Sequence, residues 1–329
     1  MAPSPAPLRN RRPWLWIGLL ALDILAAGIL ILVLSTRGEP GEGLPSLVLL
    51  PSPSGQPSAS ASGSPNPSAT PTPEPPPMLL AVGDIGSCES RYDDAVANRA
   101  ASLSGEIALL GDIAYEDGSA QDFADCFDAA WGDLGERLRP VPGNHEYETA
   151  GASGYFEYFG RAAGTSGQGW YSYDVGSWHV IALNSECGAV GCDAGSAQYE
   201  WLQADLIGHP VQCLLAYWHH PRHSSGHHGD NGFVDPLYDL LVEADVDVVL
   251  AGHDHSYERQ ARDGLREFIV GTGGRSVYDF GHPPDAATEV RATNLFGLLR
   301  LALRPGGYDW EYVPVVQTDF TDSGSAKCE

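Results

Sequence analysis

VVLAGHDHSYER, residues 248–259, joins a strand pattern to a pair of histidines. The apolar, β-branched residues at its start are typical of a strand that is buried on both faces. Gly252 then allows a tight turn, and His253 and His255 follow two positions apart. Because imidazole is a common metal ligand, this pair favours a metal site, and a loop with two solvated histidines is the alternative.

Four other apolar segments end in the same way, with polar side chains directly after a predicted strand. In open α/β sheets, ligands bind outside the carboxyl ends of the strands, so we expect these side chains to converge on one crevice. The segments cover residues 79–83, 107–111, 138–143 and 213–218, and the side chains that follow them are Asp84, Asp112 with Tyr115, Asn144 with His145 and Glu146, and His219 with His220.

The chain is strongly acidic, with a formal net charge of −25 over 329 residues. This argues against nucleic-acid binding through bulk charge, since such proteins carry basic surfaces. An anionic substrate would have to be attracted locally, by metal ions or by a few basic side chains.

The N-terminal part of the chain carries the pattern of a membrane anchor. Residues 14–34 are apolar except for Asp23 and two glycines, and they are long enough to span a bilayer. Three arginines in residues 1–13 predict that this end stays in the cytoplasm. We therefore expect a single-pass protein of the cell membrane with an uncleaved signal anchor, and secretion after signal-peptide cleavage is the alternative.

Two regions follow the predicted anchor. Residues 35–77 are largely low-complexity sequence rich in Pro and Ser, which predicts a disordered linker. Residues 78–329 are then one folded domain outside the cytoplasm, large enough to bury a substantial core.

All six cysteines lie beyond the predicted anchor, and an even number outside the cytoplasm favours disulfides. Cys187 and Cys192 close a short glycine-containing loop and form the strongest candidate pair. Free buried thiols are the alternative, above all for Cys213, which lies within a strand-like run. The remaining pairs would be Cys88 with Cys126 and, by elimination, Cys213 with Cys328.

Helix signals separate several of the predicted strands. Residues 119–127 have a helical composition, Ser196 can cap another helix, and Asp235 before Pro236 is typical of a cap followed by the first helical residue. After residue 256, strand patterns dominate. This order predicts a mixed α/β sandwich.

The strand-end motifs resemble those of a known family. GDIG at 83–86, GDIAY at 111–115, GNHE at 143–146, the His219 segment and GHDH at 252–255 resemble the five ordered motifs of the calcineurin-like metallophosphoesterases. Tyr115 and the following SYER at 256–259 make the chain most similar to the purple acid phosphatase branch. The resemblance covers residues 79–315 and implies a four-layer α/β/β/α fold with two mixed sheets.

The resemblance also implies a centre of two metal ions. Three anionic oxygen donors in the first set suit a hard ion such as Fe(III), whereas imidazole and amide donors in the second suit a divalent ion such as Fe, Zn or Mn. The first set is Asp84, Asp112, Tyr115 and His255, and the second is Asp112, Asn144, His219 and His253.

The activity implied by the resemblance is hydrolysis of phosphate monoesters of small molecules, with a metal-bound hydroxide as nucleophile. Asp112 would bridge the ions, and His145 would contact the phosphate and protonate the leaving group. His227 and His228 would contact substrate, with a solvated histidine-rich loop as the alternative. Rival functions are a phosphodiesterase or nucleotide hydrolase on the same site and a non-catalytic phosphate- or metal-binding surface protein. The oligomeric state is not predicted.

Several polar residues receive weaker assignments. Glu146 is expected to orient its neighbours, and His220 to support a ligand rather than to bind metal. Arg222 and Arg275 can offer a fork to phosphate, but we interpret them as surface arginines. No role is predicted for His179, His209 or His282.

Overall fold

A computed structural model describes residues 75–328 of the chain. Within this range, no helix has the length and apolar character needed to cross a bilayer. The predicted cytoplasmic segment 1–13, the predicted anchor 14–34 and nearly all of the predicted linker 35–77 lie outside the described residues.

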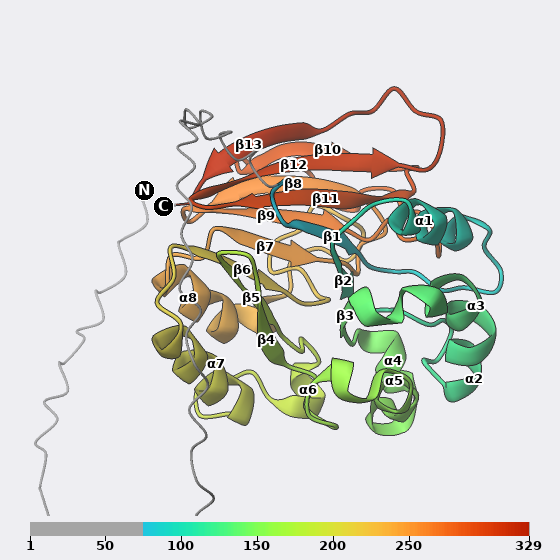
Figure 1. Ribbon diagram of the computed structural model, residues 1–329, viewed down its shortest axis with the longest axis horizontal. Helices are drawn as coiled ribbons and strands as arrows, with labels where there is room; N and C mark the ends of the chain where they lie inside the picture. Colours follow the sequence, from blue (N-terminus) through green and yellow to red (C-terminus); the bar gives the residue numbers. More distant parts are fainter. Residues whose placement is uncertain (1–74, 329) are drawn as a thin grey trace, which may run out of the picture. The chain divides into compact units, whose positions relative to one another are not determined.

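Two mixed sheets lie at the middle of the fold (Figure 1). The first has the order β13-β12-β11-β1-β2-β3, and its three neighbours β1, β2 and β3 are parallel. Its strands are β1 (Met78–Val82), β2 (Glu106–Leu110), β3 (Leu138–Val141), β11 (Gly297–Arg304), β12 (Gly307–Pro314) and β13 (Ser323–Lys327).

The second sheet has the order β10-β8-β9-β7-β6-β5-β4. Strands β5, β6, β7 and β9 are parallel, whereas β4, β8 and β10 run antiparallel to their neighbours. Its strands are β4 (Tyr171–Val175), β5 (Trp178–Ala182), β6 (Cys213–Tyr217), β7 (Val248–Ala251), β8 (Tyr257–Arg262), β9 (Leu265–Val270) and β10 (Thr288–Ala292).

Helices cover the outer face of each sheet (Figure 1). The first sheet is covered by α1 (Tyr92–Ala101), α2 (Ala120–Asp122), the π-helix Phe123–Phe127, α3 (Asp128–Trp131), the 3-10 segments 132–137, 150–152 and 160–163, α4 (Asn144–Glu148) and α5 (Ser153–Phe159). The second is covered by α6 (Cys187–Val190), α7 (Ala197–Gly208) and α8 (Asp235–Glu243), and the 3-10 turn Gly232–Val234 leads into α8.

Alternation along the buried strands explains this layering. Leu79 and Ala81 of β1 face the core between the two sheets, while Leu80 and Val82 face the helices, because successive side chains of a strand point to opposite faces. In β7, Leu250 likewise joins the core between the sheets. The sequence's expectation of strands buried on both faces, arranged in two mixed sheets, is confirmed.

Three local expectations need correction. Asp235 is the first residue of α8 and Val234 occupies the cap position, so the cap was placed one residue too late. The predicted helix over 119–127 is a short turn capped by Ser119 that continues as a π-helix. Strands β8, β10 and β13 were not predicted, because their largely polar residues lack an apolar pattern.

The three predicted disulfides are present. They join Cys187 to Cys192, Cys88 to Cys126, and Cys213 to Cys328, and no free cysteine remains among the described residues. The alternative of a free Cys213 thiol is therefore wrong. The Cys213–Cys328 bond ties the end of the chain to β6 at a sequence separation of 115.

Candidate metal centre

Five parallel strands from the two sheets deliver the predicted site residues to one place. Strands β1, β2, β3, β6 and β7 each end within a few residues of a candidate ligand. All seven candidates meet there, namely Asp84, Asp112, Tyr115, Asn144, His219, His253 and His255.

We call the first group of donors the oxygen-rich half. The Tyr115 hydroxyl lies 3.2 Å from Asp84 Oδ1, 3.1 Å from Asp112 Oδ2 and 3.3 Å from His255 Nε2. His255 Nε2 is also 3.2 Å from Asp84 Oδ1. All four side chains are buried, so their donor atoms face a common point that solvent hardly reaches.

The second group, the nitrogen-rich half, centres on His219. Its Nε2 lies 3.2 Å from Asn144 Oδ1, 3.2 Å from His253 Nδ1 and 3.3 Å from Asp112 Oδ2. The His219 Nδ1 atom donates to the Leu110 carbonyl at 2.8 Å, which leaves Nε2 to face the other donors. Burial alone would lower the pKa of His219, but Asp112 raises it to about 10, so a metal ion bound at Nε2 would replace a proton there. Two ring nitrogens facing one another in this way fit a cation between them.

Asp112 belongs to both halves. Its Oδ2 atom is near the Tyr115 hydroxyl on one side and His219 Nε2 on the other, and its Oδ1 accepts the backbone N–H of His145 at 3.0 Å. This is the place that the sequence predicts for a bridging carboxylate.

The backbone turns sharply where the strands end. Asp84, Asp112 and His253 adopt left-handed conformations with φ of 61°, 48° and 69°. Such residues cost about 1 kcal/mol or more each and are typical of functional sites. Glycines in the same motifs permit close approach: a Cβ at Gly143 would lie 2.3 Å from Asp112 Oδ1, and one at Gly111 would lie 2.6 Å from the His219 ring.

Electrostatics in the centre favour a bound cation. Burial, together with the charges of Asp112 and Asp84, raises the pKa of Tyr115 well above its ordinary value. Burial alone would raise the pKa of Asp112, but the charge and hydrogen bond of His219 hold it below its usual range. Burial and nearby His219 lower the pKa of His253, which keeps that ring neutral. Crowded acidic donors beside imidazole nitrogens fit metal ions, whose charge would stabilise the anionic oxygens.

Glu146 ties two of the strand-end loops together, as predicted. Its buried carboxylate accepts the backbone N–H groups of Ile113, Ala114 and Gly143 at 2.8, 3.1 and 2.8 Å. Burial, with the nearby Asp112 charge, raises its pKa to about 7. No hydrogen bond or ion pair of the described residues directs this carboxylate to the candidate ligands.

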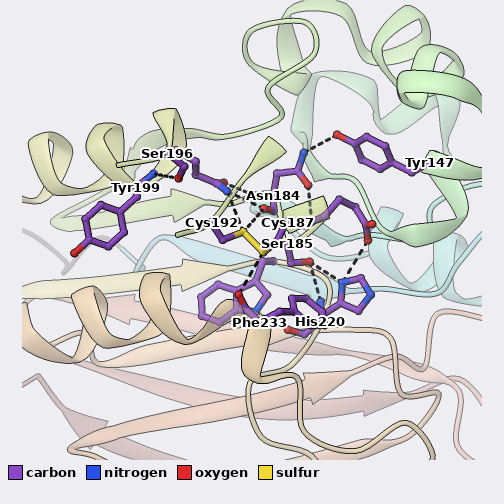
Figure 2. Close-up of a disulfide and its surroundings, with 12 residues drawn as sticks. Tyr147, Asn184, Ser185, Cys187, Cys192, Ser196, Tyr199, His220 and Phe233 are labelled. Carbon is purple, nitrogen blue, oxygen red and sulfur yellow. Dashed lines mark hydrogen bonds and ion pairs between the residues drawn. A yellow bond between two sulfur atoms is a disulfide. The ribbon is translucent and has the colours of Figure 1, made fainter. Parts of the chain in front are cut away.

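His220 supports the nitrogen-rich half, and Figure 2 shows its surroundings. Its Nδ1 atom lies 2.9 Å from Ser185 Oγ, and its ring centroid is 4.3 Å from that of His253. Ser185 precedes the Cys187–Cys192 disulfide, whose Cys187 sulfur contacts the Phe233 carbonyl. Burial and the charge of His219 lower the pKa of His220 to about 3. The disulfide therefore fixes a loop that holds His220 against His253.

The histidine-rich loop after β6 rests on two buried carboxylates. Asp254 Oδ1 accepts the backbone N–H of His228 at 2.8 Å, and Glu258 Oε2 accepts the backbone N–H of Ser225 at 2.8 Å. The His228 ring lies 4.3 Å from the His253 ring, and His227 packs against His228 at 5.1 Å. Both histidines are exposed. The loop thus places them at the rim of the nitrogen-rich half.

The two arginines differ in position. Arg222 pairs with Asp235 at the start of α8, and no hydrogen bond or ion pair among the described residues joins it to a candidate ligand. Arg275 pairs with Glu116 at 2.6 Å, and its guanidinium lies 5.1 Å above the Tyr115 ring. Arg275 is therefore more closely connected with the centre than its interpretation as a surface residue suggested.

Other supporting residues were not predicted. Ser276 Oγ lies 2.7 Å from His255 Nδ1, and Asp254 and Glu258 hold the histidine-rich loop. Asp254 stands between the two histidines of the sequence motif, which is the one local signal that could have identified it. Ser276 lies 21 residues from its partner and carries no such signal.

Comparison with known proteins agrees with the motifs. The family model described as calcineurin-like phosphoesterase matches residues 78–257. Purple acid phosphatase 22 of Arabidopsis thaliana is 28% identical over 262 residues, covering 68% of this chain and 57% of the relative. Purple acid phosphatase 1 of Ipomoea batatas is 28% identical over 204 residues, covering 55% and 42%. The chain spans about half the length of the curated relatives it matches.

Two solved structures share the fold. Purple acid phosphatase PPD1 from yellow lupin (Lupinus luteus) seeds superposes with a TM-score of 0.64 at 19% identity, covering 76% of this chain and 53% of that one. GAP50, the anchor in the inner membrane complex of Plasmodium, gives a TM-score of 0.64 at 12% identity, covering 78% and 90%. Because the family model matches more than half of this chain, the chain belongs to the calcineurin-like phosphoesterase family.

Proposed function

We propose that this protein is a dinuclear metal-dependent phosphoester hydrolase that acts on phosphate monoesters. The observation that best supports the proposal is the meeting of seven donor side chains at the ends of five strands, with Asp112 between the two halves. Similarity to the purple acid phosphatases implies a dinuclear centre.

The donor chemistry supports a different ion in each half. The oxygen-rich half, with Asp84, Asp112 and Tyr115, suits Fe(III), and the nitrogen-rich half suits a divalent Fe, Zn or Mn ion. When bound, such ions supply an activated water for attack on phosphorus and neutralise the phosphoryl oxygens.

His145 is proposed to protonate the leaving group. Its Nδ1 atom contacts the Glu116 carbonyl, and its ring packs 4.4 Å from the Tyr115 ring. This orientation leaves Nε2 3.9 Å from Asp112 Oδ2, on the side of the centre. In its protonated form the ring donates Nδ1–H to Glu116 and holds a second proton at Nε2, which it can give to the departing alcohol oxygen.

His227 and His228 are proposed to contact the phosphoryl oxygens of the substrate. The support is their exposure and the position of the His228 ring next to His253. Their loop is held by hydrogen bonds to Asp254 and Glu258, so the two rings need little ordering when a substrate binds.

An extracytoplasmic location is part of the proposal. Its support is the three disulfides, which persist mainly in oxidising compartments. The anchor over residues 14–34 remains a prediction from the sequence.

Metal analysis combined with two substrates tests the proposed function. The full chain should bind two metal ions and hydrolyse 4-nitrophenyl phosphate faster than bis(4-nitrophenyl) phosphate. Faster hydrolysis of the diester would favour the phosphodiesterase alternative. Two bound ions without hydrolysis of either ester would favour a non-catalytic binding protein. The variant Arg161→Ala, exposed on the 3-10 turn after α5, is the control for the preparation.

A further inference from the structure

A groove of about 700 Å³ opens beside the oxygen-rich half, within the volume range of small-molecule sites. It runs between the loop that precedes α1 and the segment that follows β9. Its wall includes Arg91, Tyr92, Arg275, Ser276, Val277 and Phe296.

The inner end of the groove is lined by residues that contact the metal centre. Ser276 lies on its wall and contacts His255 Nδ1 at 2.7 Å. The guanidinium of Arg275, also on the wall, lies 5.1 Å above the Tyr115 ring, and its backbone N–H donates to the Asp84 carbonyl at 3.1 Å. The groove therefore lies next to the residues that support Tyr115 and His255.

The outer part of the groove presents flat, largely apolar surfaces. The rings of Tyr92 and Phe296 are stacked, with centroids 4.1 Å apart and planes 11° from parallel, and Val277 adds an aliphatic surface. The Arg91 guanidinium lies 5.2 Å from the Tyr92 ring, and within residues 75–328 no carboxylate lies at ion-pair distance from it. Aromatic rings and guanidinium planes both stack on planar groups.

Resting on the proposed hydrolase function, we propose that this groove binds the organic part of the substrate and selects phosphate monoesters of aromatic or heteroaromatic alcohols. The phosphate lies at the metal centre, and the planar group extends past Arg275 to stack beside Tyr92. Arg91 also gives the groove a cationic group with no carboxylate partner among residues 75–328, whereas Arg275 is paired with Glu116 and with Glu89, which lines the groove as well.

Equilibrium binding of two phosphonates tests this proposal without requiring turnover. Phenylphosphonate and methylphosphonate carry the same anion, and only the first has a ring to enter the groove. Calorimetry on the metal-loaded full chain should show phenylphosphonate binding about tenfold more tightly, in line with the contribution of one stacked ring. In Tyr92→Leu, and in Val277→Trp, which narrows the groove, the ratio of the two dissociation constants should fall towards one.

The outcomes separate this proposal from the proposed function. A wild-type ratio near one, or a ratio unchanged in both variants, overturns the groove proposal. Two variants are used because Tyr92 also packs on Phe296, and a thermal unfolding midpoint for each shows that the fold is intact. Arg161→Ala should keep the wild-type ratio. Failure to hydrolyse either nitrophenyl ester while the phosphonate ratio holds would reject the hydrolase function and leave the groove as a binding site for aromatic phosphates.

Discussion

The metal centre and a second group of histidines and aspartates contain the same types of side chain, but only the metal centre arranges them to bind an ion. The second group, here the hairpin cluster, comprises Asp174 of β4, His179 of β5, Asp205 of α7 and the following His209. Asp174 Oδ1 lies 2.9 Å from His179 Nδ1, and Asp205 Oδ2 lies 2.8 Å from His179 Nε2. Both nitrogens of that ring are therefore taken by carboxylates.

Ring orientation separates the two groups. In the hairpin cluster, the His179 and His209 rings stack 4.1 Å apart and only 14° from parallel. Lone pairs lie in the plane of an imidazole, so those of stacked rings cannot meet at one ion about 2 Å from each nitrogen. In the metal centre, the His219 and His253 rings are 75° apart, and two of their nitrogens face one another. Residue type alone therefore does not make a metal site; converging lone pairs do.

Removing the carboxylate that both halves of the metal centre share should have the largest effect on metal binding and hydrolysis. In Asp112→Asn, both halves lose an anionic donor, so both ions should be retained poorly and hydrolysis should fall by at least about a hundredfold, since loss of supporting groups alone costs 10- to 100-fold. Metal content after gel filtration and the rate on 4-nitrophenyl phosphate measure the effect. The matched change in the hairpin cluster, Asp205→Asn, should keep both ions. Metal loss in that variant would show that the hairpin cluster binds metal after all.

The Tyr115 hydroxyl belongs to the oxygen-rich half alone, and Tyr115→Phe should affect that half. If the ion there is Fe(III), wild-type protein has a tyrosinate charge-transfer band in the visible spectrum, and the variant should lose it. We expect retention of that ion to fall by about tenfold to a hundredfold. Tyr158→Phe, which removes a hydroxyl that contacts Asp128, is the control and should keep the band. A colourless wild type with zinc or manganese in this half would contradict the Fe(III) assignment.

A smaller effect on metal retention is expected when a residue that supports the nitrogen-rich half is changed. Ser185→Ala removes the hydrogen-bond partner of His220, which packs on His253, so retention of the divalent ion should weaken about tenfold. Competition with a chromogenic chelator measures this. Ser172→Ala is the matched change in the hairpin cluster, because Ser172 donates to Asp205 there at 2.8 Å, and it should leave metal retention unchanged. Equal weakening in both variants would mean that general loosening, rather than support of His220, is responsible.

Many residues of the metal centre could be predicted because each follows a recognisable strand pattern in the sequence. Most ligands follow an apolar strand and a glycine turn, whereas His219 follows its strand through Trp218, and parallel strands bring such ends together. The supporting contacts were not predictable, because Ser276 and Ser185 meet their histidines across 21 and 35 residues with no pattern at either position. The edge strands β10 and β13 were not predicted for a similar reason, because they are defined by pairing with a neighbouring strand rather than by a buried apolar pattern.

The smallest expected effect concerns the stability provided by the hairpin cluster. Burial alone would lower the pKa of His179, but hydrogen bonds to Asp205 and Asp174 outweigh it and raise the pKa. Burial alone would raise the pKa of Asp205, but His179 holds it below its usual range. The contribution of His179 to folding stability is therefore complete below the ordinary histidine pKa of 6.5, and it is lost as pH rises through the raised pKa of the folded state. The aspartate contribution is complete above its ordinary pKa of 3.8 and is lost as pH falls through the lowered value.

His179→Gln should therefore reduce the free energy of unfolding by about 2 kcal/mol near pH 6, as expected for hydrogen bonds between charged groups, and by less near pH 9. Urea unfolding at the two pH values measures the difference, and metal analysis should still find two ions. His209→Gln, which replaces the more exposed ring, should change stability less. A loss that is the same at both pH values would mean that His179 acts through packing, whereas a larger loss at pH 6 means that its charge between two carboxylates holds the hairpin to α7.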